Sequence, residues 1–535
     1  MKEISSEILK PGRYINKEWN SAHKKWSEDI LKIALCFPDI YEVGMSHLGL
    51  KILYEILNNQ EGILCERAFA PWPDMEKAMR DSGEKLFSLE SGRQLKDFDI
   101  IGFSLQYEMN FSDVLNIMDM GGIPVYSDRR SDNDPLVIAG GPCSFNPAVM
   151  SRFIDIFVVG EAEEVILEII EAVKDYKLKY GIDKGKLLKE ISRIDGIYIP
   201  TISHTSSIKK RIVKDLDGSC FPLRPVVPYI QIVHDRIGIE IMRGCPHRCK
   251  FCQACKIFQP LRLRSSERVL EIAEESIRNT GYDEISLLSL SSGDYPNIDE
   301  LVARLQERFK GKGIKVSLPS LRVKSFHPHS EASIMKRAGL TFAPESGSDI
   351  LRKKLNKNIE NRDIIEKSRL AFKYGWRKVK LYFMVGLPEE TERDLDAILE
   401  LASQVGRSSL SISPFIPKPH SEFEDYEMDA LEALIEKQNY LRKKCNERKI
   451  GKRIRMNFHS PYMSMIEGVL SRGDSNIGRV VYRVWKQGGR FQAWDEHFDY
   501  KLWIECFQAE GIDPKAYLGK PGKSACFPWS FIVLK

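Results

Sequence analysis

Four of the eleven cysteines lie within one short stretch, and their spacing is suited to binding a metal. Cys245, Cys249 and Cys252 form a Cys-x3-Cys-x2-Cys loop, and Cys255 follows three residues later. Three thiolates on one loop can hold three irons of a cubane 4Fe-4S cluster and leave the fourth iron open to a cofactor or substrate. The alternative is a closed zinc site in which Cys255 or His247 supplies the fourth ligand. The loop therefore predicts a metal centre, and an open iron would make it catalytic.

The elements around this loop predict a barrel that presents it at a catalytic end. The loop directly follows the first of several apolar runs that alternate with segments of helical period, and active sites of barrels lie at the carboxyl ends of their strands. Six such steps are fewer than the eight of a closed barrel, so we expect a partial (β/α)6 TIM-type barrel whose repeat ends after Pro414. The expected strands are 237–242, 285–290, 316–318, 341–343, 379–385 and 410–413, and the clearest helices are 267–278 and 393–404.

A separate α/β unit precedes the barrel. Its alternating strand and helix patterns predict a Rossmann-like, doubly wound domain, and such sheets bind ligands beyond the carboxyl ends of their strands. Ser104, Gly140 and Gly141 stand at those ends and are the candidate ligand contacts. The expected strands are 33–37, 100–104, 136–139 and 154–159.

The C-terminal region is helix-like, basic and rich in aromatic residues. Its basic run, between Lys437 and Arg455, is either a solvated helix face or a binding site for a phosphate-bearing substrate such as RNA. Trp485, Phe491 and Trp503 are more simply the core of a helical cap than a base-stacking platform. The expected order is an N-terminal segment 1–27, the Rossmann-like domain 28–215, a linker 216–236, the barrel 237–420 and the C-terminal region 421–535.

The amino-acid composition limits the classes of protein to which the chain can belong. With 43% hydrophobic and 29% charged residues the chain is typical of a folded protein and not of a disordered one. A net charge of +5 over 535 residues does not by itself indicate a nucleic-acid binder. The first residues lack the apolar core of a signal peptide, and no run is long enough to span a membrane. We therefore expect a cytoplasmic protein with reduced cysteines and no membrane partner.

The cysteine spacing, with Phe251 just before the third cysteine, resembles the cluster motif of the radical S-adenosylmethionine (SAM) superfamily. Its place after the first strand of a six-step barrel agrees with that resemblance. More closely, the chain resembles an uncharacterised bacterial family that fuses a cobalamin-binding-like domain to a radical SAM barrel. Besides the cysteine loop, the likeness lies in 229–236, 319–323, 342–347 and 384–391, and it extends over nearly the whole chain.

The resemblance implies roles for individual residues. Cys245, Cys249 and Cys252 would ligate a 4Fe-4S cluster, SAM would chelate the open iron, and reduction would yield a 5'-deoxyadenosyl radical. Phe251 would lie near the adenine. Cys255 departs from the family, where a glycine usually stands, and we favour an idle buried thiol over a ligand of a second metal. The other candidate SAM contacts are Ser291, Ser292, Gly293, Asp294, Arg322, Glu345, Ser346, Gly386 and Pro388.

Whether the first domain holds cobalamin is left open by its sequence. Domains that bind cobalamin through a lower-axial histidine usually carry Asp-x-His-x-x-Gly, which this chain lacks, and His47 has the wrong spacing. Cobalamin would then bind without that histidine, near Ser104, Gly140 and Gly141. The alternative is a domain that only covers the barrel mouth. In either case, a radical must be kept from water, so we expect this sheet edge to face the cysteine loop across a shared cavity.

The sequence thus favours a radical SAM enzyme, and among such enzymes a cobalamin-dependent methyltransferase with an unidentified substrate. One alternative is radical SAM modification of RNA or protein without cobalamin. The other is a zinc-stapled nucleic-acid-binding module without catalysis. The expected partners are an electron donor such as flavodoxin or ferredoxin and a substrate that is RNA or a phosphorylated molecule. The chain ends soon after Trp529, earlier than the family pattern leads us to expect.

Overall fold

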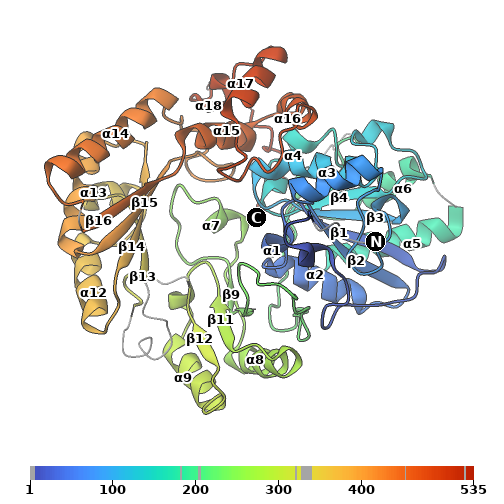
Figure 1. The fold of residues 1–535 in the computed structure, drawn as a ribbon, viewed down its shortest axis with the longest axis horizontal. Coiled ribbons are helices and arrows are strands. Elements are labelled where there is room, and N and C mark those ends of the chain that lie inside the picture. The colour runs from blue at the N-terminus through green and yellow to red at the C-terminus, as the bar shows by residue number, and fades with distance from the viewer. Residues whose placement is uncertain are drawn as a thin grey trace.

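Two α/β units stand side by side, and the C-terminal helices join them (Figure 1). The first unit is drawn in blue and cyan, the barrel in green to orange, and the C-terminal helices in red. This computed structural model describes residues 7–180, 183–202, 207–319, 322–326, 340–451, 453–522 and 526–534.

The first unit is a six-stranded sheet with the order β2-β1-β3-β4-β5-β6, in which β6 alone is antiparallel. This confirms the Rossmann-like expectation, but β2 and β6 were not predicted. The strand β2 contains Glu66 and Arg67, which are both buried, so its sequence lacks a continuous apolar run. The elements are β1 (Leu31–Phe37), α1 (Tyr41–Gly44), α2 (Leu48–Asn58), β2 (Ile63–Phe69), α3 (Pro73–Ser82), β3 (Ile100–Ser104), α4 (Phe111–Met120), β4 (Leu136–Gly140), β5 (Ile156–Val158), α5 (Val165–Tyr180), α6 (Lys184–Ile191) and β6 (Ile197–Tyr198).

The barrel consists of two parallel arcs. One has the strand order β12-β11-β8, and the other has the order β13-β14-β15-β16. Helices cover the outer faces, which is the expected arrangement of a partial TIM-type barrel. The elements are β8 (Ile237–Glu240), β9 (Met242–Arg243), α7 (Ala254–Ile257), β10 (Arg262–Leu263), α8 (Ser266–Thr280), β11 (Glu284–Leu288), α9 (Ile298–Arg308), β12 (Lys315–Ser317), β13 (Leu340–Glu345), α11 (Asp349–Lys354), α12 (Asn361–Lys373), β14 (Val379–Val385), α13 (Glu392–Val405), β15 (Ser408–Pro414), α14 (Leu431–Glu447) and β16 (Ile454–Phe458).

The repeat does not end after Pro414, so that expectation was wrong. The helix α14 and the strand β16 add one more step, and β16 pairs in parallel with β15. In β16, Ile454 is buried while Arg455 and Asn457 are exposed. The strand was not predicted because it is short and its polar residues continue the surrounding basic run, so its alternation of buried and exposed residues did not stand out. The expected domain boundaries themselves stay predictions.

The inner face of the second arc is polar. Leu381 and Phe383 of β14 point outward into the core beneath the helices, so Lys380 and Tyr382 lie on the inner face. The register places Ser409 between Lys380 and Arg455. In a closed barrel such positions carry branched apolar side chains that fill the interior. This arc instead presents hydroxyl groups and cations to the inside.

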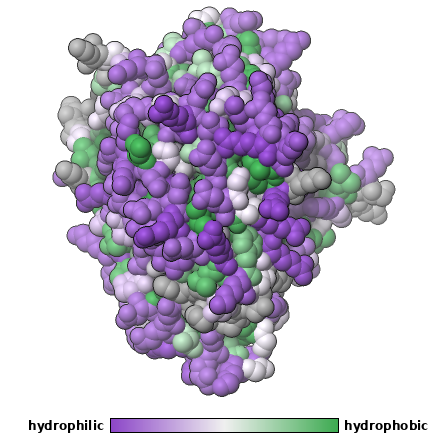
Figure 2. All heavy atoms as spheres, turned by 90° about the vertical axis from the view of Figure 1, so that its left-hand side faces the viewer, coloured by the Kyte–Doolittle hydropathy of each residue, from purple (hydrophilic) through white to green (hydrophobic). Residues whose placement is uncertain are grey.

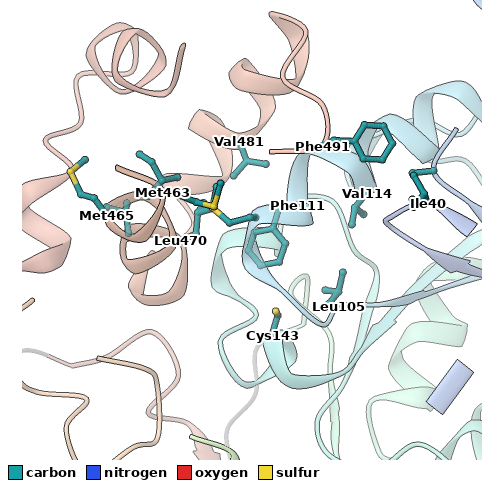
Figure 3. Packing of buried hydrophobic residues seen from close by; sticks show 14 of the residues in the cluster. Ile40, Leu105, Phe111, Val114, Cys143, Met463, Met465, Leu470, Val481 and Phe491 are labelled. Atoms are coloured by element: carbon teal, nitrogen blue, oxygen red, sulfur yellow. The ribbon is translucent and has the colours of Figure 1, made fainter. Parts of the chain in front are cut away.

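The C-terminal helices pack against the first unit, as Figure 3 shows. Phe111 and Val114 of α4 lie in one core cluster with Val481 and Phe491. Trp485, Phe491 and Trp503 are all buried, which confirms the aromatic core expected for this region. The elements are α15 (Pro461–Arg472), α16 (Ile477–Lys486), α17 (Tyr500–Ala509) and α18 (Lys515–Leu518). Near the end of the chain, β17 (Ile532–Val533) pairs in parallel with β7 (Ile208–Lys209), which follows the first sheet in sequence.

The face that carries α12, α13 and α14 is mainly hydrophilic, and its hydrophobic residues are scattered (Figure 2). Single exposed apolar side chains are ordinary on protein surfaces. Across the described ranges, no helix is both long enough and apolar enough to span a membrane.

Candidate functional site at the junction of the two units

The cysteine loop begins in a tight turn after β9. Gly244 has a φ of +89°, and a Cβ there would lie 2.9 Å from the carbonyl oxygens of Phe258 and Pro260. Only glycine fits this position without strain. The turn directs the chain back across the barrel mouth, with Cys249 buried and Cys245 and Cys252 half-buried.

The side chains of Lys357 and Arg322 place two positive charges near the cysteines. Burial raises the pKa of Cys249, and the nearby charges of Lys357 and Arg322 oppose that shift. Lys357 also lies 2.9 Å from Glu345, and its Nζ stands 5.9 Å from the centre of the Phe251 ring. The sequence analysis missed Lys357, because it follows α11 in a stretch that carries no motif. The positive charge of Lys357 favours the thiolate form of Cys249, and it attracts the carboxylate of Glu345.

Cys255 lies inside the loop. Its Sγ is 3.0 Å from the carbonyl oxygen of Cys252 and 3.4 Å from that of Cys249. A hydrogen bond from Cys255 lowers the pKa of Cys252 to about 6, while the pKa of Cys255 itself is raised. The proton of this pair therefore stays on Cys255, which behaves as a buried hydrogen-bond donor.

The donor chemistry of the loop fits an iron–sulfur cluster. Three thiols on one short loop with cations nearby are the soft, anionic ligands that such clusters use. The Nε2 of His247 lies 2.8 Å from Asp294 Oδ2, which orients the imidazole ring beside the loop. In the part of the chain that the structure describes, no three His, Cys, Asp or Glu side chains converge on the position of a single metal ion, as a closed zinc site would require.

Several of the expected SAM contacts gather around this loop. Asp294 accepts hydrogen bonds from His247 and from Ser291, and Arg322 is close enough to lower the pKa of Cys245 against the raising effect of burial. Ser292 is buried and donates to the carbonyl of Leu287, which fixes the turn that also contains Gly293. Together with Glu345 and Lys357, these residues form a polar rim at the mouth, and the Phe251 ring lies beside Lys357.

The remaining expected contacts are held within their own loops. The Ser346 hydroxyl accepts from the backbone N–H of Ser348. Gly386 has a φ of +80°, and its N–H donates to Glu390. Pro388 is half-buried in the turn after β14. Their assignment as SAM contacts stays a prediction.

A cavity of about 410 Å³ joins the two units. Ser104, Gly140 and Gly141 line it from the first unit. Arg243 and Gly244, which lead into the cysteine loop, line it from the barrel. This sheet edge therefore shares a cavity with the residues that lead into the cysteine loop, which confirms the expectation in part, since the three cysteines are not among the residues that line it. Its deeper walls are apolar and run along the sheet toward α2 and α5, as the residues Ile33, Leu35, Leu53, Ile138, Val158 and Ile166 show.

His47 lines this cavity but is not free to ligate a metal. It caps α2, and its Nδ1 accepts a hydrogen bond from the N–H of Leu50 at 3.1 Å. Burial lowers the pKa of His47 to about 4, so the ring is neutral near pH 7. A neutral imidazole that accepts at Nδ1 carries its proton on Nε2. This nitrogen therefore has no lone pair for cobalt, in agreement with the expectation that cobalamin would bind without this histidine.

Buried ion pairs hold the two units together beside the cavity. Glu161, just beyond β5, lies 2.7 Å from Arg262 and 3.2 Å from Arg243, and Glu163 lies 2.7 Å from Arg243. Burial acts to raise the pKa of Glu161, but the two arginines outweigh it and lower that pKa. The sequence analysis missed this contact, whose signal was the pair of carboxylates after the Gly160 turn.

Comparisons with known proteins agree with this geometry. Residues 49–200 match the family described as radical SAM proteins, N-terminal, and residues 239–402 match the radical SAM superfamily. An uncharacterized protein of Methanocaldococcus jannaschii is 30% identical over 84% of this chain and 91% of its own length. An uncharacterized methyltransferase of Pyrococcus horikoshii is 24% identical over 62% of this chain and 75% of its own length.

Among solved structures, the radical SAM methyltransferase TsrM of Kitasatospora setae, with cobalamin and a [4Fe-4S] cluster bound, has a similar fold. Its TM-score is 0.50 at 14% identity, over 72% of each chain. At that identity the likeness concerns the fold alone. This chain belongs to the radical SAM superfamily and is an enzyme of that class, which uses a 4Fe-4S cluster and SAM. The non-catalytic zinc module is therefore set aside, and the restriction to bacteria stays a prediction.

Proposed function

We propose that this protein is a cobalamin-dependent radical SAM methyltransferase, with Cys245, Cys249 and Cys252 as ligands of its cluster. The cavity that Ser104, Gly140 and Gly141 share with Arg243 and Gly244, directly before the cysteine loop, is the observation that carries the proposal. When bound, the cluster and SAM would supply a 5'-deoxyadenosyl radical, and cobalamin would supply a methyl group. The apolar walls along the first sheet suit the nucleotide tail of cobalamin, and the glycines leave room at the strand ends.

The comparisons support this choice over radical modification without cobalamin. One relative is named as a methyltransferase, and the similar fold belongs to a methyltransferase that holds cobalamin. In this protein the rim residues Asp294, Arg322 and Lys357 would orient SAM at the cluster. The C-terminal helices and the first unit would keep water from the reacting groups.

The proposed substrate is polar and bears phosphate, with RNA as one form of it. Lys380 and Arg455 face the inside of the second arc, and among the described residues no carboxylate pairs with either. The basic run on α14 supports this less, because Lys437 pairs with Glu390 and Arg448 with Asp396. We keep flavodoxin or ferredoxin as the electron donor. The cysteines among the described residues form no disulfide, which fits the reducing cytoplasm.

Iron analysis tests the cluster ligands. Anaerobically reconstituted protein should contain about four irons per chain, and a triple variant with alanine at Cys245, Cys249 and Cys252 should lose them. Cys255→Ala is the matched control and should keep its iron, because Cys255 only donates hydrogen bonds within the loop. Iron retained by the triple variant, or stoichiometric zinc in the unaltered protein, would overturn the assignment.

Cobalamin loading tests the cavity. Protein from a cobalamin-supplied host should show the absorbance of bound cobalamin, and with a reductant and SAM it should form both 5'-deoxyadenosine and S-adenosylhomocysteine. Gly140→Val should abolish cobalamin but keep iron, since a Cβ there has no neighbour closer than 3.8 Å and a larger side chain would project into the cavity. His47→Gln should keep cobalamin. Protein that binds iron but never cobalamin would favour radical modification without it.

A further inference from the structure

A second, smaller cavity lies at the interface between the first unit and the barrel. Its volume is about 220 Å³, and it is enclosed by α2, the linker and the inner face of β8 and β11. It shares Leu48 and Leu288 with the larger cavity, so the two adjoin. Neither the cysteine loop nor the proposed cobalamin contacts line it.

Lys51 of α2 brings an ammonium group to this cavity. In the described ranges, no carboxylate lies within ion-pair distance of its Nζ, and Asp235 acts on it only from farther away. Burial lowers the pKa of Lys51 to about 8, so the group is still largely protonated at pH 7. Lys51 is half-buried, and an ammonium group partly removed from water without a counter-ion is unfavourable, which leaves Lys51 short of an anionic partner.

Ser286 of β11 is the second unsatisfied group. Its side chain is fully buried, and its Oγ has no hydrogen-bond partner among the residues described. The register pairs Ser286 with Gly238 of β8, which has no side chain to fill the space beside it. A Cβ on Gly238 would lie 2.7 Å from Leu288 Cδ1, so a larger residue at this position would require the Leu288 side chain to shift.

The other charged groups around the cavity largely satisfy one another. Arg236 lies 2.8 Å from Glu284, and burial lowers the pKa of His234 so that it is neutral near pH 7. Asp235 is exposed. The rest of the wall is apolar and includes rigid proline rings, as Phe221, Pro222, Pro225 and Pro319 show. Among the described residues, the lining therefore offers one unpaired cation and two hydroxyls without a hydrogen-bond partner, those of Ser286 and Tyr282.

We propose that this cavity binds a small anion, a carboxylate or a phosphate, through the Lys51 ammonium and the Ser286 hydroxyl. Lys51 belongs to the first unit and Ser286 to the barrel, so the bound anion would bridge them. It would strengthen the contact that also encloses the larger cavity. The site goes beyond the proposed methyl transfer and stands whether or not cobalamin binds.

Calorimetric titration of the cluster-loaded protein tests the site. Phosphate, pyrophosphate, acetate and malonate are titrated separately at pH 7, which distinguishes the two anion chemistries. We expect one class to bind at millimolar concentration or tighter, Lys51→Met to weaken it at least tenfold, and Ser286→Ala to weaken it less. Lys51→Arg should keep binding. Lys189→Met, which removes an exposed lysine of α6, is the matched control and should bind like the unaltered protein.

Two results would overturn the proposal. One is that the unaltered protein binds none of the four anions, and the other is that Lys51→Met and Lys51→Arg both bind as it does. Iron and cobalamin are measured in the same samples. A failure of anion binding with full cofactor loading would leave the proposed function intact, and absent cobalamin with anion binding would leave this site intact.

Discussion

At the scale of single residues, surroundings decide what each ionisable side chain can do. Cys252 and Cys255 are identical groups three residues apart, yet the proton of the pair stays on Cys255. His47 has the ring of a metal ligand, but it caps a helix and lines an apolar cavity. Residue type alone therefore did not assign these roles, because hydrogen bonds and burial set the protonation states.

His47 should make the stability of the protein depend on pH. Its folded pKa of about 4 lies below the ordinary value of about 6.5, so the unfolded chain binds the proton more readily. The stabilisation is complete above about pH 6.5, and it is lost progressively as the pH falls from about 6.5 to about 4. His47→Asn keeps a capping side chain without titrating. Urea unfolding at pH 7, 6 and 5 should give a flatter profile for this variant, whereas exposed His23→Asn should leave the profile unchanged.

At the scale of elements, short strands and turns bring charges from distant segments into contact. The strand β10 contributes Arg262, whose guanidinium donates to Glu161 after β5 and to the carbonyl of Val213. Arg243 of β9 reaches the same carboxylate. These bonds connect the strand that leads into the cysteine loop to the edge of the first sheet, so the larger cavity depends on them.

Arg262→Met should weaken this connection strongly. The Arg262 and Glu161 side chains are only 8% and 9% exposed, and removal of one partner leaves a buried charge that Arg243 only partly compensates. We expect the free energy of unfolding to fall by about 3 kcal/mol. Lys77→Met breaks an exposed pair and should change the free energy of unfolding far less, because exposed ion pairs contribute little. Equal effects of the two variants in urea unfolding would contradict this account.

At the scale of the whole molecule, the C-terminal region holds the two units in one arrangement. Lys418 follows β15, and its Nζ lies 3.0 Å from Glu108 of the first unit and 2.8 Å from Glu467 of α15. Tyr107 donates a hydrogen bond to Glu467 at 2.7 Å. One lysine thus connects all three parts of the chain.

Lys418→Met should destabilise the assembled protein by about 3 kcal/mol at pH 7, because two carboxylates would lose their shared cation. Burial acts to raise the pKa of Glu467, and Lys418 outweighs it and lowers that pKa. Without Lys418 the Glu467 carboxyl group should take up a proton more easily, so the difference in unfolding free energy should narrow from pH 7 to pH 5. A difference that stays constant or widens would contradict this explanation.

Local patterns in the sequence determined much of the fold and the centre of the site. The run 379–385 coincides with β14, because alternation along a buried strand is a local property. The cysteine loop could be placed at a strand end for the same reason. The strands β2 and β16 escaped prediction, since Glu66, Arg67, Arg455 and Asn457 interrupt their apolar pattern.

Only the tertiary structure decided which distant groups meet. Lys357 reaches the cysteine loop from beyond α11, and Arg262 finds Glu161 across about a hundred residues of chain. The second cavity combines Lys51, Ser286 and Gly238, which have no relation in sequence. Such contacts depend on how whole elements pack, and the energies that select one packing are sums over many distant pairs. The residue types were therefore readable from the sequence, while their partners and protonation states were not.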